Sequence, residues 1–228
     1  MILFSYNFPH KKTVDIINTL VSKKIKIDLI IAANKKKLKL AKKPFIIKTN
    51  NLLDSHPAVI AKKYNIPYII EDHNSEVIVS KLKKIRPLIG LITGARIIKK
   101  SIIDSFKIGI VNLHPGDIPY IRGLDSILKA IKLNHKIVVT SHLIDFDIDA
   151  GYIIDKEEVV IDINDSIEDI YCKVYDTQLN ILIPSITKAL KREFKKVDLS
   201  GFKYDKNFPY QTKDRFIEDF KNYKKRHL

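Results

Sequence analysis

The sequence has little of several features that would place a protein in a special class. Only one cysteine, Cys172, occurs among 228 residues, which excludes an internal disulfide framework. Cys172 lies in a helical pattern, and we expect it to pack in the core like a small apolar residue. No apolar run approaches the roughly 18 residues of a membrane span, and the opening MILFSYNF lacks the basic flank of a signal peptide. We therefore expect a cytoplasmic protein with no membrane partner.

Motifs of several common chemistries are also missing. The sequence has no G-x-x-x-x-G-K-[ST] or G-x-G-x-x-G loop, which argues against nucleoside-triphosphate and dinucleotide chemistry. It has no G-x-S-x-G turn for a serine nucleophile. His114 and His142 occur among several aspartates, but no H-x-x-x-H or H-E-x-x-H spacing and no cysteine pair accompanies them. We therefore expect no metal site.

Positive charge is abundant. Lysine and arginine number 41 against 26 aspartates and glutamates, and the net charge is +15, which invites a nucleic-acid interpretation. Lysine is nevertheless spread over nearly every surface segment, with local concentrations at 34–43 and 222–227. We interpret most of this charge as solvated surface and expect no nucleic-acid partner.

The order of expected elements predicts the fold class. Continuous apolar runs such as KIDLIIAA and KIGIVNLH are typical of buried parallel strands, and they alternate with helical patterns through about residue 135. Two later strands, at 136–145 and 151–161, are joined too closely for a crossover helix, so we expect an antiparallel extension. A long helix at 166–194 should bend near Pro184. We predict an α/β domain at 1–197 with helices on both sheet faces, and a C-terminal extension at 198–228 that packs on it.

Polar residues arrive abruptly where the strand at 107–114 ends, in the stretch NLHPGDIPYIRG. Asn112 and His114 are two positions apart, so an extended chain points both side chains to the same side. The loop TSHLIDFDIDAG adds His142 and Asp149, and a carboxylate beside an imidazole orients its ring. Because ligands gather at the carboxyl ends of parallel strands, we expect an active site here.

These stretches resemble the formyltransferase family that uses 10-formyltetrahydrofolate. The resemblance runs from about Asn74 to Val160. The compound pattern N-x-H-P, R-G, T-x-H and D-x-G is specific to that family, and TGARIIKKSIIDSF resembles its strand and folate-wall segment. The resemblance implies a Rossmann-like, mostly parallel twisted sheet, and folate as the formyl donor. It also implies the catalytic trio Asn112, His114 and Asp149.

The resemblance implies further site residues. The walls of the folate pocket are expected at Ala95, Arg96, Ile97, Asp145, Phe146, Asp147 and Ile148. The substrate is expected to meet Asn7, His10, Lys11, His73, Arg122, Gly123 and His142. His142 alternatively serves as a structural hydrogen-bonding group in its strand. Many relatives are dimers, so a homodimer is also an expectation.

Departures from the family patterns indicate the acceptor amine. The turn after the first strand, SYNFPHKK, lacks the glycines that hold phosphate in glycinamide ribonucleotide transformylases. We expect no tRNA-binding domain after the long helix, such as methionyl-tRNA formyltransferases carry, and no regulatory domain before the first strand, such as formyltetrahydrofolate hydrolases carry. We expect a small-molecule acceptor, a nucleotide-linked amino sugar, whose base or sugar could lie against Phe202, Tyr204, Phe208 or Tyr210. Those aromatic residues alternatively anchor the tail. Formylation of methionyl-tRNA or glycinamide ribonucleotide, and a non-catalytic nucleic-acid-binding protein, are the alternatives.

Overall fold

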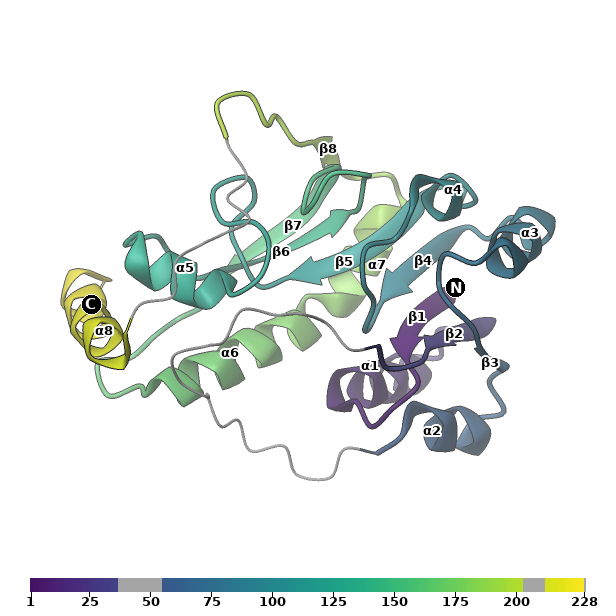
Figure 1. Ribbon diagram of the computed structural model, residues 1–228, viewed down its shortest axis with the longest axis horizontal. Helices are drawn as coiled ribbons and strands as arrows, with labels where there is room; N and C mark the ends of the chain where they lie inside the picture. Colours follow the sequence, from purple (N-terminus) through teal and green to yellow (C-terminus); the bar gives the residue numbers. More distant parts are fainter. Residues whose placement is uncertain (37–54, 203–211, 228) are drawn as a thin grey trace.

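A computed structural model of the chain describes residues 1–36, 55–202 and 212–227. Its strands form one sheet in the order β3-β2-β1-β4-β5-β6-β7-β8. The pairs among β1 to β5 are parallel, whereas β5–β6, β6–β7 and β7–β8 are antiparallel. The predicted parallel sheet with a late antiparallel extension is therefore confirmed, and Figure 1 shows the helices arranged around it.

The elements follow the predicted alternation, with a two-residue strand and a 15-residue helix added at the end. The strands are β1 (Ile2–Tyr6), β2 (Leu29–Ala33), β3 (Tyr68–Ile70), β4 (Ile89–Ile92), β5 (Gly109–His114), β6 (Val138–Leu143), β7 (Tyr152–Glu158) and β8 (Lys195–Lys196). The helices are α1 (Lys11–Ser22), α2 (Pro57–Lys63), α3 (Glu76–Ile85), α4 (Lys100–Ile103), α5 (Ser126–Lys132), α6 (Ile167–Asn180), α7 (Leu182–Leu190) and α8 (Lys213–His227).

Alternate strand residues face opposite sides of the sheet and build two apolar clusters. Leu3, Ile30 and Val111 point to the side where α1, α5, α6 and α7 pack. Ile2, Phe4 and their neighbours point to the opposite side, where α3 and α4 pack. Both faces are therefore covered, which explains why the parallel strands are continuous apolar runs instead of alternating ones.

The long helical segment is divided in two, as predicted. Helix α6 ends at Asn180, and α7 begins at Leu182 with Pro184 as its third residue. A proline has no backbone N–H for the helical ladder and its ring crowds the preceding turn, so it is tolerated only in the first turn of a new helix.

Two features of the C-terminal half differ from expectation. Cys172 is exposed, so its predicted core position is wrong. It lies between Ile170 and Val174, which are spaced by four residues and form the buried stripe of α6. Helix α8 was not predicted; it packs against α5 through buried Phe216 and Tyr223.

The aromatic residues of the tail are only partly placed. Phe202 meets Tyr120 edge-on, with ring centroids 5.1 Å apart. Tyr204, Phe208 and Tyr210 lie outside the described residues, as does most of the basic stretch at 34–43. Across the three described ranges, no helix is both long and apolar enough to cross a membrane.

Candidate active site

The site begins where β5 and β6 lie side by side. Asn112 pairs with His142 across the two strands, and His114 pairs with Thr140. His114 and His142 are buried, whereas Asn112 is half-buried. The Asn112 Nδ2 atom lies 3.2 Å from His142 Nε2, so the amide and the second imidazole form a direct cross-strand contact.

The hydrogen bonds of His142 determine where its proton lies. Its Nδ1 atom is 2.9 Å from the carbonyl oxygen of Ala150, and a carbonyl can only accept, so Nδ1 carries the hydrogen. Burial lowers the pKa of His142 to about 4, against the opposing influence of Asp149, so the ring is neutral near neutral pH. Nε2 therefore presents a lone pair, which accepts a hydrogen bond from the Asn112 amide. This contact fixes the amide and leaves its second N–H for another acceptor.

His114 is constrained at both ring nitrogens. Its Nε2 atom lies 3.0 Å from the Ile121 carbonyl oxygen and therefore donates to it. Its Nδ1 atom faces Asp149 Oδ2 at 3.4 Å. Burial lowers the pKa of His114, although the Asp149 carboxylate opposes the shift. The nitrogen that gains or loses a proton is therefore Nδ1, and the proton it gains lies next to a carboxylate.

Asp149 is held in place by the loop that follows His114. Its Oδ2 atom accepts a hydrogen bond of 2.6 Å from the Gly123 N–H. Arg122 donates from Nε and Nη2 to the Ile148 carbonyl oxygen, at 2.9 and 2.5 Å. Asp149 itself has a φ of +44°, a left-handed conformation that is unfavourable for most side chains. The Arg-Gly pair thus clamps the loop that carries the carboxylate.

Close packing around the imidazole explains two further residues. A Cβ atom added to Gly116 would lie 2.5 Å from His114 Nε2 and 2.6 Å from the Ile121 carbonyl oxygen, so no side chain fits there. The Thr140 hydroxyl donates to the Gly116 carbonyl oxygen at 2.7 Å. Thr140 therefore ties β6 to the turn beside His114.

The predicted folate walls lie at the end of β4 and in the loop after β6. Ala95 and Ile144 pack on the same apolar cluster, and the Tyr6 hydroxyl donates to the Ala95 carbonyl oxygen at 3.0 Å. The side chains of Ile97 and Phe146 are 69% and 63% exposed. Large apolar side chains left uncovered near a polar site would suit the wall of a pocket for an aromatic ring.

Of the other predicted wall residues, Arg96, Asp145 and Asp147 are charged and Ile148 is apolar. Arg96 Nη2 donates to the Lys36 carbonyl oxygen at 3.0 Å. Asp145 accepts a hydrogen bond from the N–H of Phe146, Asp147 is exposed, and Ile148 is partly buried and bonded to Arg122 as described above. Their contact with folate stays a prediction.

The expected substrate residues outside the trio fall into two groups. Arg122, Gly123 and His142 belong to the framework that holds Asn112 and Asp149. His73 is buried, and its Nε2 donates to the carbonyl oxygens of Ser5 and Ile31. Asn7, His10 and Lys11 lie after β1. Asn7 is hydrogen-bonded to Asn34 and Tyr68, His10 to Thr13, and Lys11 forms an ion pair with Asp15. Their contact with substrate stays a prediction.

Backbone carbonyls are the part of the site that sequence reasoning missed. The oxygens of Ile121 and Ala150 set the protonation of the two imidazoles, and an apolar side chain gives no sign of such a role. Within the described part of the chain, no group of three or more His, Cys, Asp or Glu is arranged to hold a metal ion.

Comparison with known proteins assigns the chain to a family. Residues 11–186 match the family described as formyl transferase. The chain belongs to this family. Matches to curated members are shorter. The chain is 29% identical over 104 residues to phosphoribosylglycinamide formyltransferase of Bacillus subtilis (strain 168). It is 30% identical over 115 residues to methionyl-tRNA formyltransferase of Thermodesulfovibrio yellowstonii. These two matches cover 45% and 50% of this chain, but only 53% and 37% of the two relatives' own lengths.

Solved structures of family members share the fold of this one. Phosphoribosylglycinamide formyltransferase from Bacillus halodurans aligns with a TM-score of 0.61 at 22% identity, covering 92% of this chain and 99% of that one. The N-formyltransferase from Helicobacter canadensis, solved with folinic acid and dTDP-3-aminofucose, aligns with a TM-score of 0.63 at 19% identity. That alignment covers 90% of this chain and 70% of that one. At such identities the likeness establishes the fold, and the acceptor must be inferred from the site.

Proposed function

We propose that this formyl transferase family member moves a formyl group from 10-formyltetrahydrofolate to a primary amine. The observation that carries the proposal is the joined cluster of Asn112, His114 and Asp149, with His142 holding the amide and Gly123 holding the carboxylate. Family membership supports the same chemistry. The intact cluster also argues against the alternative of a non-catalytic nucleic-acid-binding protein.

The residues present suit attack of the amine on the formyl carbon. A bond forms between the acceptor nitrogen and that carbon, while the bond from the carbon to the donor nitrogen breaks. The formyl oxygen becomes an anion in between, and the second N–H of Asn112 is available to donate to it. One such donor is worth on the order of 3 kcal/mol of transition-state stabilisation.

The proton released by the amine needs a destination. The Nδ1 atom of His114 can accept it, because Nε2 is already committed to the Ile121 carbonyl. Asp149, 3.4 Å away, then stabilises the imidazolium, and the proton can pass on to the departing donor nitrogen. No bond to the protein is required at any step.

For the acceptor, we propose an amino sugar attached to a nucleotide. The stretch SYNFPHKK, which runs from the end of β1 to the start of α1, has no glycine and so lacks the backbone conformations that hold phosphate through amides alone. Basic side chains in that stretch would suit a pyrophosphate instead. A fold neighbour was solved with dTDP-3-aminofucose, which makes this class of acceptor a reasonable first choice.

A panel assay tests the acceptor and the chemistry together. The protein is incubated with 10-formyltetrahydrofolate and, separately, with dTDP- and UDP-linked 3-amino and 4-amino sugars, glycinamide ribonucleotide and methionyl-tRNA. Formylation of an amino sugar supports the proposal. Turnover only of glycinamide ribonucleotide or methionyl-tRNA overturns the acceptor assignment, and tight salt-sensitive RNA binding without any formylation overturns the chemistry as well.

A further inference from the structure

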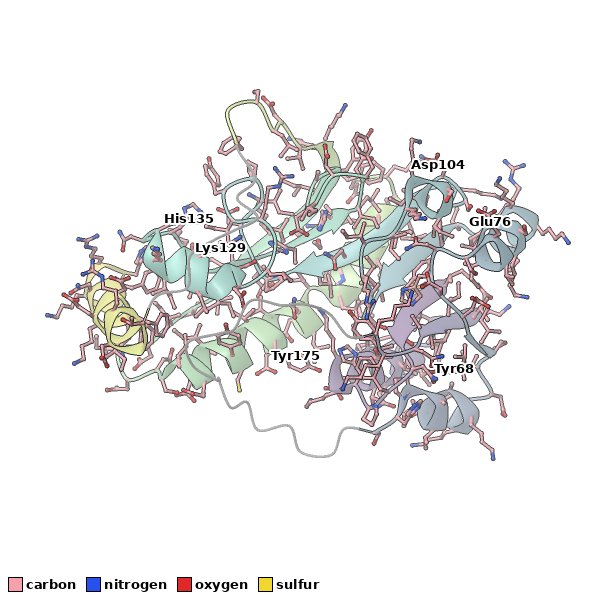
Figure 2. All side chains as sticks on the ribbon, in the orientation of Figure 1. Tyr68, Glu76, Asp104, Lys129, His135 and Tyr175 are labelled. Carbon is pink, nitrogen blue, oxygen red and sulfur yellow. The ribbon has the colours of Figure 1, made fainter. Side chains whose placement is uncertain are left out.

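Helix α5 carries a buried lysine. Lys129, labelled on α5 in Figure 2, is only 7% exposed, and every residue of the helix from Ser126 to Ile131 is buried. Lysine side chains are rarely buried unless the ammonium has a polar partner. The Lys129 ammonium donates a hydrogen bond of 2.9 Å to the backbone carbonyl oxygen of Arg122. The helix therefore places a positive charge inside the protein, on the loop that connects β5 to α5.

The Arg122 carbonyl and the Gly123 N–H belong to one peptide unit. The Gly123 N–H is the group that donates to Asp149 Oδ2 at 2.6 Å. In a planar trans peptide the C=O and N–H bonds point in opposite directions. The Lys129 ammonium and the Asp149 carboxylate thus lie at opposite ends of the same unit. Because the unit is rigid, an ammonium that fixes its oxygen also fixes the direction of its N–H.

The two hydrogen bonds of this peptide strengthen one another. Each includes a charged group, and charge-assisted hydrogen bonds are stronger than neutral ones. A cation at the carbonyl oxygen draws electron density from the nitrogen, which makes the N–H a better donor. The Asp149 side chain is only 14% exposed, so little water competes for the carboxylate. Cation, peptide and carboxylate therefore form one hydrogen-bonded chain that ends beside His114.

A second contact from α5 reaches the same loop. Ser126 lies three residues before Lys129, on the same side of the helix, and its hydroxyl donates to the Gly123 carbonyl oxygen at 2.8 Å. The Ser126 Oγ atom is also 3.4 Å from His114 Nε2. Burial is the main cause of the lowered pKa of His114, and the charges of Lys12 and Lys129 lower this pKa further, against the influence of Asp149. Helix α5 thus acts on the site from close range.

We propose that Lys129 is a positioning residue for formyl transfer: its ammonium holds the Arg122–Gly123 peptide, and this peptide holds the Asp149 carboxylate against His114. The inference rests on the proposed function, since Asp149 must take part in the reaction for its position to matter. Lys129 acts through the peptide and contacts no substrate. Without the ammonium the peptide is free to tilt, and the carboxylate loses its alignment with the imidazole Nδ1 atom. The rate of transfer should then fall while both substrates still bind.

One NMR signal reports on both ends of this peptide. The dipeptide Arg-Gly occurs once in the sequence, so protein labelled with carbonyl-13C arginine and 15N glycine gives a single HNCO peak. The carbonyl carbon shift reports the bond from Lys129, and the amide proton shift reports the bond to Asp149. Lys129→Met keeps a long apolar side chain without the charge, and we expect both shifts to move upfield. Asp149→Asn should move the amide proton much more than the carbonyl carbon.

Kinetics with an acceptor found by the panel assay provide the second readout. Lys129→Met should lower kcat about tenfold to hundredfold, as small displacements of reacting groups do, and leave both KM values nearly unchanged. Lys129→Arg keeps the positive charge and should lose much less of kcat. Lys136→Met is the matched control, because it removes the same charge from an exposed position just after α5, where Lys136 pairs with Glu158. Circular dichroism verifies folding, and Lys129→Gln serves as the neutral variant if Lys129→Met does not fold.

Three results would overturn the inference. The first is a neutral variant of Lys129 whose carbonyl and amide shifts match those of the wild type, and the second is changed shifts with an unchanged kcat. The third is a raised KM at constant kcat, which would assign Lys129 to substrate binding. The shifts are measured without substrate, so the two proposals can fail separately. If the wild type formylates no acceptor but Lys129→Met moves both shifts, the proposed function fails while the orienting role of Lys129 stands.

Discussion

The buried His142 makes the stability of the protein depend on pH in a way that can be calculated. In the folded chain the imidazole is neutral, because burial lowers its pKa from an ordinary value of 6.5 to about 4. In the unfolded chain the same ring takes up a proton near its ordinary pKa. Between these two values the unfolded state binds more protons, so stability is full above the unfolded pKa and falls as the pH falls toward the folded one.

The size of this effect follows from the two pKa values. Linkage gives a loss of about 2 kcal/mol from this residue between about pH 7 and about pH 5, and roughly 3 kcal/mol by pH 4. His142→Gln removes the titrating group and keeps an amide that can donate to the Ala150 carbonyl and accept from Asn112. We therefore expect the stability of His142→Gln to fall by about that much less than the stability of the wild type as the pH falls.

Urea unfolding followed by circular dichroism, at several pH values between about 5 and 8, measures the difference. His73 and His114, whose pKa values burial also lowers, are present in both proteins, so their contributions cancel in the comparison. The reasoning would be refuted if the wild type and His142→Gln lost the same stability over this range. That result would mean that the ring is charged, or exchanges its proton freely, in the folded chain.

Three further predictions concern the geometry of the site. Gly116→Ala should lower turnover by about a hundredfold and stability by about 1–3 kcal/mol, since the new methyl displaces the His114 ring by roughly 1 Å. The same substitution in a His114→Ala background should cost less stability, because the methyl then meets only the Ile121 carbonyl. Asn112→Ala should lower kcat by about a hundredfold or more with little change in the unfolding midpoint, and near-wild-type turnover would remove it from the mechanism. Arg122→Met should loosen the loop that carries Asp149 and lower kcat while the protein stays folded, and an unchanged rate would show that Gly123 holds the carboxylate alone.

The parts of the fold that follow from side-chain periodicity were predictable. Continuous apolar runs identify strands covered on both faces, and the close spacing of the two later strands identifies the antiparallel pair. The same periodicity places Asn112 and His114 on one side of β5, which the structure shows. Only the position of Asp149 relative to them required tertiary contacts, because it depends on the clamp from Arg122 and Gly123.

Other features were hidden for a physical reason or were overlooked. The carbonyl groups of Ile121 and Ala150 orient both imidazoles, but every residue has a carbonyl, so no sequence pattern marks them. The stripe Phe216, Phe220 and Tyr223 has helical spacing and could have predicted α8. The phase of α6 could likewise have shown that Cys172 faces outward, since Ile170 and Val174 define the buried side.

The antiparallel pairing of β5 with β6 makes the proposed catalytic site sensitive to strand alignment. His142 and Thr140 come from a segment far along the chain, yet they must lie opposite Asn112 and His114. Sliding β6 by a single residue would turn both side chains to the opposite face of the sheet. The Asn112 amide would then lose its contact with His142, and the Gly116 carbonyl would lose its hydrogen bond from Thr140. A misaligned molecule could then retain nearly all of its secondary structure and still be inert.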